Sequence, residues 1–146
     1  ASSLLSTGKA RVLVDMRSLA GPTTALGGNS PAACLYMETS WVEAHRATVQ
    51  KLANAFVRTL RFIASHSAVE IAALMPEDFY VGDKDMYVRA LAESKSMFTT
   101  DGRMPEGGPE TVLGVLSKIK ANLRSKTIDL SKTYTTEFVD KANASF

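Results

Sequence analysis

Asp15 and Arg17 are the charged side chains whose place in the chain could serve ligand binding. They follow Val12, Leu13 and Val14, a continuous apolar run typical of a short buried strand over residues 10–16. In sheets covered by helices, ligands bind outside the carboxyl ends of the strands, where this pair would lie. The alternative is that Arg17 forms a surface ion pair with Asp15 or another carboxylate.

Residue types that could support catalysis are few and far apart. His45 and His66 lie at opposite ends of an expected helix, about 30 Å apart, so they cannot share a metal or a catalytic triad. Cys34 is the single cysteine, and its apolar surroundings predict a buried structural thiol rather than a nucleophile. No zinc-protease, nucleophile-elbow or phosphate-loop motif occurs. We therefore predict no enzyme activity, no catalytic residue, no metal site and no cofactor.

A long helix over residues 46–66 is the element most clearly predicted. Apolar residues recur along it with helical spacing, including Val49, Phe56 and Leu60, so it can serve as a spine for shorter elements. Two capping boxes are predicted around it. The first pairs Ser40 with Glu43, and the second pairs Ser67 with Glu70.

The other elements are shorter. Residues 32–37 form a second expected buried strand, and residues 18–31 are rich in glycine and proline, which predicts a loop or a flexible crossover. Later helices are expected over residues 68–74, 83–95, 109–124 and 135–142. Two strands do not make a stable sheet, so either the helices form most of the core or strands from elsewhere complete a sheet.

Composition is ordinary for one globular domain. The 146 residues are 45% hydrophobic and 22% charged, with a formal net charge of +2. No basic run suggests a nucleic-acid or membrane surface, and no apolar run is long enough to cross a bilayer. The helix over residues 68–74 offers no side chain that could read bases, so we predict no nucleic-acid partner.

Several short motifs carry a family resemblance over essentially the whole chain. They are RVLVDMR at 11–17, the Gly27-Gly28 loop with Pro31, the 49–63 helix, MPEDFY at 75–80, DGRMP at 101–105, GGPE at 107–110 and TYTTEF at 133–138. In their order and spacing the chain resembles the C-terminal portion of periplasmic substrate-binding proteins of ABC transporters. The branch is that of nitrate, sulfonate and taurine uptake, which also includes proteins related to thiamine-precursor synthesis.

This resemblance implies an α/β fold, namely the C-terminal part of a two-lobed (type II) periplasmic-binding-protein fold. Within this chain the fold would be mostly helical with two short early strands. Residues 1–20 would end the second lobe, residues 21–31 would form the hinge crossover, and residues 32–146 would be the C-terminal helical part of the first lobe. The N-terminal lobe of the same protein would be a missing partner, and the fragment could self-associate.

The implied function is capture of a small, anionic organic or inorganic solute in the cleft between the lobes. The solute would be delivered to an ABC permease in the inner membrane. The location would be the periplasm, with the signal peptide outside this chain. Cleft candidates flank the expected strand ends and the crossover: Asp15, Arg17, Gly27, Gly28, Asn29 and Tyr36. For the two glycines a structural hinge is the alternative to ligand contact, and Tyr36 could point into the core or the cleft.

Two other function classes stay open. A thiamine-precursor-type enzyme would share the fold, but it needs a cysteine-rich motif, and Cys34 stands alone. A helical protein-interaction module without small-molecule binding predicts a self-contained core and an oligomer interface.

Overall fold

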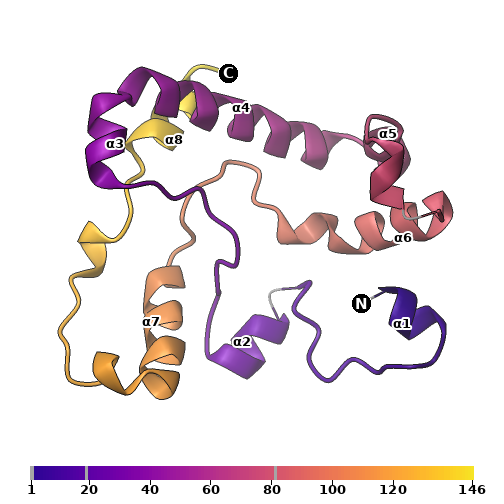
Figure 1. The fold of residues 1–146 in the computed structure, drawn as a ribbon, viewed down its shortest axis with the longest axis horizontal. Coiled ribbons are helices and arrows are strands. Elements are labelled where there is room, and N and C mark those ends of the chain that lie inside the picture. Colours follow the sequence, from indigo (N-terminus) through magenta and orange to yellow (C-terminus); the bar gives the residue numbers. More distant parts are fainter. Residues whose placement is uncertain (1, 19, 81) are drawn as a thin grey trace.

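The computed structural model describes residues 2–18, 20–80 and 82–146 (Figure 1). The α-helices are α1 (Ser2–Ser6), α2 (Ala20–Leu26), α3 (Thr39–Ala44), α4 (Arg46–Ser65), α5 (Ala68–Ala73), α6 (Lys84–Ser94), α7 (Gly108–Ile119) and α8 (Glu137–Ala144). Short 3-10 turns η1 (Glu77–Tyr80), η2 (Lys95–Met97), η3 (Ala121–Leu123) and η4 (Leu130–Lys132) connect some of them.

The fold class is helical, so the α/β expectation is wrong. Within the described residues there is no strand, and both runs predicted as strands, 10–16 and 32–37, are irregular chain. A strand is defined by hydrogen bonds to a neighbouring strand. The described backbone bonds pair neither run with another segment. Apolar content alone therefore did not make these runs strands.

The spine helix is confirmed as α4, which runs along the upper edge of Figure 1. α8 packs most extensively against it, although the two helices lie far apart in the sequence. Val57 on α4 is only 1% exposed, and Phe138 and Ala142 on α8 are also buried. The core between these helices forms because both present an apolar stripe at helical spacing.

α5 and α6 fold back from the far end of α4. Ser67 and Glu70 form the predicted capping box at α5: the Glu70 amide donates to Ser67 Oγ at 3.2 Å and the Ser67 amide donates to Glu70 Oε2 at 2.8 Å. The capping box predicted from Ser40 is wrong. α3 begins with Glu38 as its N-cap and has no side-chain cap, and Glu43 instead pairs with Arg46 at 2.9 Å.

The glycine- and proline-rich segment is partly helical, because α2 occupies residues predicted to be irregular. Pro22 is buried in the first turn of α2, where a missing backbone N–H costs little. Gly27 ends the helix: its N–H donates to the Thr23 carbonyl at 3.0 Å, and its φ of +87° is the left-handed conformation that favours glycine after a helix.

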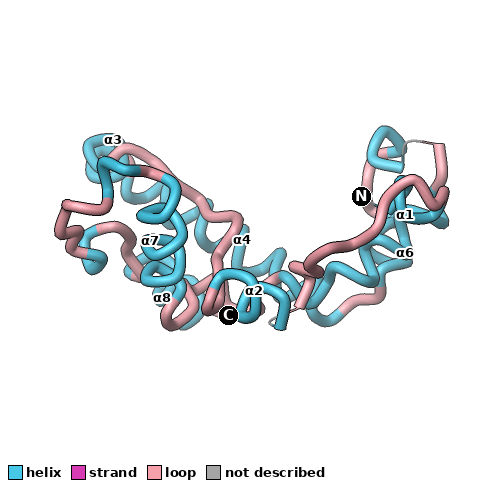
Figure 2. The backbone as a smooth tube through the Cα atoms, turned by 90° about the horizontal axis from the view of Figure 1, so that it is seen from below, coloured by secondary structure: helices cyan, strands magenta, loops and turns pink. Residues whose placement is uncertain are grey.

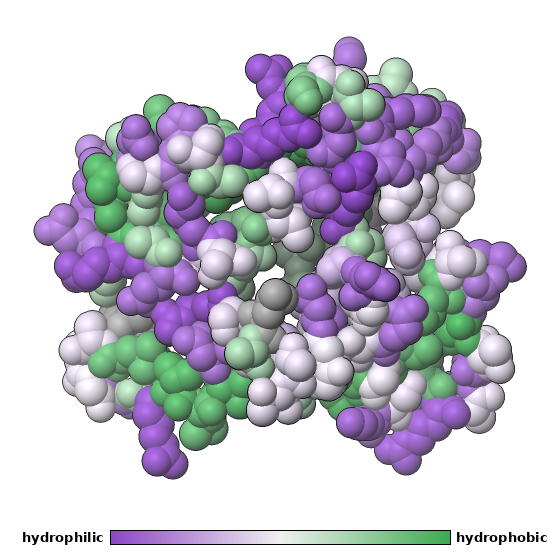
Figure 3. All heavy atoms as spheres, turned by 180° about the vertical axis from the view of Figure 1, so that it is seen from behind, coloured by the Kyte–Doolittle hydropathy of each residue, from purple (hydrophilic) through white to green (hydrophobic). Residues whose placement is uncertain are grey.

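The molecule is an open arc rather than a closed core. In Figure 2 the two ends of the arc, at α3 and at α1, both rise above its middle. The accessible surface is 10492 Å². A compact monomer of this mass, 15.7 kDa, would expose about 7,300 Å². Figure 3 shows apolar residues reaching the surface in several separate areas, with openings between them.

Candidate functional site

Arg17 and Asp15 form a two-pronged ion pair. Arg17 Nε donates to Asp15 Oδ1 at 2.8 Å and Arg17 Nη2 donates to Asp15 Oδ2 at 2.7 Å. These bonds from Arg17 hold the pKa of the Asp15 carboxyl down at about 2. The pKa of the Arg17 guanidinium is raised, first by the same hydrogen bond. This is the surface ion pair that the sequence left as the alternative to an anion contact.

Three further contacts fix this pair against α6 and α2. Arg17 also bonds Glu93 on α6, and Ser96 Oγ donates to the Arg17 carbonyl at 3.0 Å. Gly21 in α2 lies so close to the Asp15 carbonyl that a Cβ at this position would overlap it. Two carboxylates thus face one guanidinium. The cluster carries a net negative charge, and a solute anion would have to displace a carboxylate to reach Arg17.

Gly27, Gly28 and Asn29 form a separate junction between α2 and the irregular chain that leads to α3. Gly28 lies directly against the Thr111 hydroxyl on α7, and a Cβ there would overlap it. Gly27 has open space around it. Asn29 is half-buried, and no interaction of its side-chain amide occurs within the described chain. Its amide is free to donate and accept hydrogen bonds.

Tyr36 is 88% exposed, so it points neither into a core nor at another predicted site residue. Cys34 nearby is exposed as well, which makes the predicted burial of its thiol wrong. The apolar run 32–37 suggested burial, but no described element covers it. Among the predicted site residues, the structure therefore brings Asp15 and Arg17 together. Within the described residues, no hydrogen bond or ion pair joins these two to Tyr36 or to the junction at Gly27.

Both histidines bind their own helices. His45 Nδ1 lies 2.9 Å from the Trp41 carbonyl, and His66 Nδ1 lies 2.9 Å from the Phe62 carbonyl. Each ring stacks on the aromatic ring four residues earlier. The described residues contain no group of three or more histidine, cysteine or carboxylate side chains that could hold a metal ion, and no described helix is long and apolar enough to cross a membrane.

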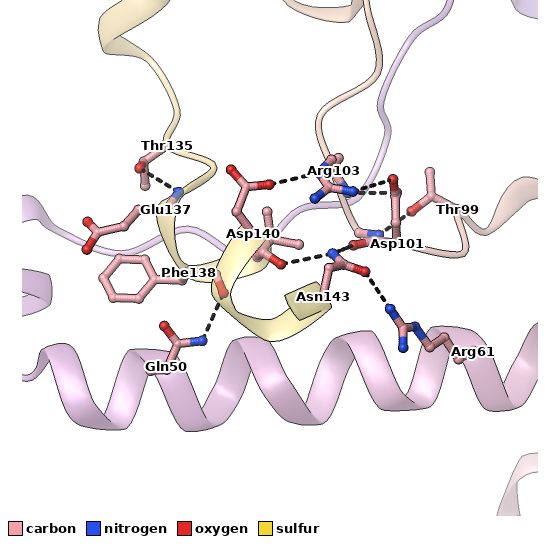
Figure 4. A network of polar contacts seen from close by, with 12 residues as sticks. Gln50, Arg61, Thr99, Asp101, Arg103, Thr135, Glu137, Phe138, Asp140 and Asn143 are labelled. Atoms are coloured by element: carbon pink, nitrogen blue, oxygen red, sulfur yellow. Dashed lines mark hydrogen bonds and ion pairs between the residues drawn. The ribbon is translucent and has the colours of Figure 1, made fainter. Parts of the chain in front are cut away.

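A polar network that the sequence did not reveal docks α8 onto α4 (Figure 4). Asn143 is its centre: its amide donates to the Asp101 and Val139 carbonyls at 2.8 and 2.9 Å and accepts from Arg61 at 2.9 Å. Gln50 donates to the Phe138 carbonyl at 2.8 Å. Val139 lies one turn before Asn143 in α8, but the other partners lie far apart in the sequence, and no motif or periodicity links them.

Ion pairs flank this network. Arg103 bridges Asp140 at 2.8 Å and Asp101 at 3.3 Å, while Glu137 pairs with Arg46 and with Lys141. The hydrogen bond from Arg46, followed by that from Lys141, lowers the pKa of Glu137 to about 2. Every side chain in these pairs is more than one third exposed, so each pair contributes little to the stability of the fold. Only Arg46–Glu137 and Arg103–Asp140 join α8 to another segment and so position it.

Two surface hollows lie away from the predicted residues. One, about 500 Å³, is bounded by residues of the 77–84 turn, among them Glu77, Asp78 and Lys84. The other, about 260 Å³, lies between α4 and the 95–100 segment and includes Leu60 and Phe98. Neither is lined by a residue that the sequence put forward as a ligand contact.

A solved structure of a protein from Bordetella bronchiseptica RB50 has the same arrangement over nearly all of this chain. The TM-score is 0.92 at 34% sequence identity, and the match covers 99% of this chain and 45% of that chain. This chain therefore spans less than half the length of the Bordetella protein. No protein-family model and no curated protein sequence matches the chain.

Proposed function

We propose that this chain belongs to the solute-binding component of an ABC importer. The component would capture a small, anionic solute in the periplasm and deliver it to a permease in the inner membrane. The proposal starts from the sequence motifs that resemble such proteins. The observation that supports it best is the junction at Gly27–Asn29, where chain without regular structure combines a glycine in open space with a side-chain amide that bonds no group of the described chain.

The junction has the properties that domain closure around a ligand requires. Gly27 adopts φ +87°, and a Cβ added there would have nothing within 4 Å, so rotation meets little steric resistance. The side-chain amide of Asn29 can donate two hydrogen bonds to an anion. A ligand that contacts the protein on both sides of such a hinge binds the closed state more tightly than the open state, and it therefore favours closure.

Arg17 has a different role in this proposal from the one first expected. Two carboxylates already engage its guanidinium, so it holds residues 10–18 against α6 rather than offering a free cation. The anion would be bound by neutral hydrogen-bond donors. Gly28 is assigned to the hinge because its contact with Thr111 leaves no room for a ligand atom on that side.

A thermal-shift panel tests this function on the natural polypeptide that contains the chain. The probes are taurine, alkyl and aryl sulfonates, nitrate, bicarbonate, aromatic carboxylates and pyrimidines. A probe at 100 times its Kd stabilises the folded state by about 2.7 kcal/mol, which raises Tm by several degrees. Asn29→Ala is expected to abolish the shift, and Asn122→Ala, an exposed amide in η3, to leave it unchanged. Absence of a shift with every probe would contradict the proposal.

A helical protein-interaction module is the second candidate, and the large exposed apolar surface favours it. However, that alternative predicted a self-contained core. The buried apolar residues of the described chain are small in number and mostly small in size: Val49, Val57, Ala68, Ile71, Ala72, Phe138 and Ala142. Isolation of the natural polypeptide as a stable complex with another protein, with no response to any solute, would favour the interaction module.

A further inference from the structure

The described chain exposes far more surface than its mass requires. The accessible surface of 10492 Å² exceeds that of a compact monomer by roughly 3,200 Å². A standard protein–protein interface buries about 800 Å² on each partner, and an obligate one about 1,000–2,500 Å². The excess is thus larger than one dimer interface would cover.

The exposed apolar side chains also come from separate parts of the fold. Leu13 is 82% exposed and Tyr36 88%, each in a different irregular segment, while Leu74 after α5 is 70% and Ile119 in α7 is 69% exposed. A two-fold dimer uses one self-complementary patch on each copy. A second copy would therefore leave much of this surface in water.

A longer polypeptide supplies an occupant of suitable size. The Bordetella structure repeats this fold over 99% of the present chain, and more than half of its own length lies outside the match. A segment of that length is large enough to contact several faces of this chain at once. Its contacting surface must be apolar, since the faces it covers are.

We propose that further polypeptide of the same protein packs on this chain and buries the two irregular apolar segments 10–16 and 32–37. Leu13 and Tyr36 are the central contacts of the two segments. Cys34 becomes buried in the same step because it lies two residues from Tyr36. This inference extends the proposed function because it says where the rest of the protein contacts this chain. It does not depend on whether a solute binds.

Paired melting curves test the covering surface. In the natural polypeptide, Leu13→Asp and Tyr36→Asp are each expected to lower Tm by several degrees, since each places a charge in an apolar contact. Thr127→Asp places the same charge at an exposed polar side chain and should leave Tm unchanged in the same polypeptide. Tyr36→Phe is the matched control and should keep the wild-type Tm.

Three outcomes would overturn the inference. One is a Tm that Leu13→Asp and Tyr36→Asp lower no more than Thr127→Asp does. Another is a natural polypeptide whose mass equals that of this chain. The third is a concentration-dependent dimer in which a second copy protects Leu13 and Tyr36. Loss of the solute response with the Tm differences intact would refute the proposed function alone.

Discussion

Arg17 binds both carboxylate oxygens of Asp15, at 2.8 and 2.7 Å, across a single intervening residue. Contacts of Arg17 with Glu93 and Ser96 then hold the irregular segment 10–18 against α6 and the turn that follows it. The two residues that looked most like ligand contacts therefore satisfy each other. Their chemistry serves the placement of an otherwise irregular segment.

The first prediction concerns the titration of Asp15. Its folded pKa of about 2 is below the ordinary value, so the pair contributes stability above the unfolded pKa and loses it as pH falls through about 2. Arg17→Gln is expected to raise the Asp15 pKa toward the ordinary 3.8 in an NMR titration. The pKa of Asp129, lowered by Ser131 and Lys132, should not change. An unchanged Asp15 would contradict the geometry.

The second prediction concerns acid release of α8. The pKa of Glu137 is lowered to about 2, mainly by Arg46, so its pairing supports α8 docking above the unfolded pKa and is lost as pH falls through about 2. In Arg46→Gln the Glu137 pKa should rise, and the α8 amides should lose their native NMR shifts at a higher pH. Arg89→Gln, on α6, serves as a distant control. Identical acid transitions in both variants would refute this.

The third prediction uses two glycines with the same backbone conformation. Gly102 and Gly107 both have φ +70°, but a Cβ on Gly102 would lie 3.3 Å from Leu60 Cδ1 and 3.4 Å from Val139 Cγ2, whereas Gly107 has open space. Alanine at Gly107 should cost about 1–2 kcal/mol from the left-handed conformation alone. Alanine at Gly102 should cost about 1 kcal/mol more through crowding. Urea unfolding measures both, and equal costs would show that Gly102 is not packed against α4 and α8.

The fourth prediction tests where the small core lies. Val57 is 1% exposed at the α4–α8 contact, while Val69 on α5 is 62% exposed. Val57→Ala removes two buried methyl groups' worth of packing and should cost about 2 kcal/mol. Val69→Ala should fall within about 0.5 kcal/mol of wild type. A reversed order would place the core elsewhere.

Helical periodicity was a reliable guide where a helix carries its own hydrogen bonds. The spine 46–66 and the capping box at Ser67 appear as predicted. The runs around Leu13 and Leu35 were misread because a strand needs a partner that periodicity cannot supply. α2 was missed because Pro22 read as a loop signal, although the first turn of a helix tolerates it.

The site was harder to predict than the fold. Sequence order placed Asp15 beside Arg17, and their pairing follows from that proximity. Glu93, Ser96 and Thr111 complete the surroundings from α6, η2 and α7. No spacing rule joins residues so far apart in the chain. The exposure of Cys34 and Tyr36 likewise depends on what covers residues 32–37, which the residue types alone do not reveal.

Hydrogen exchange at the Leu13 and Tyr36 amides tests the central claim most directly, namely that this open helical chain is covered by more of its own protein. The measurement compares these two amides with that of Thr127, an exposed residue of irregular chain, within the natural polypeptide. We expect exchange at Leu13 and Tyr36 to be at least about hundredfold slower than at Thr127. Exchange as rapid as at Thr127 would show that nothing covers these segments and would contradict the claim.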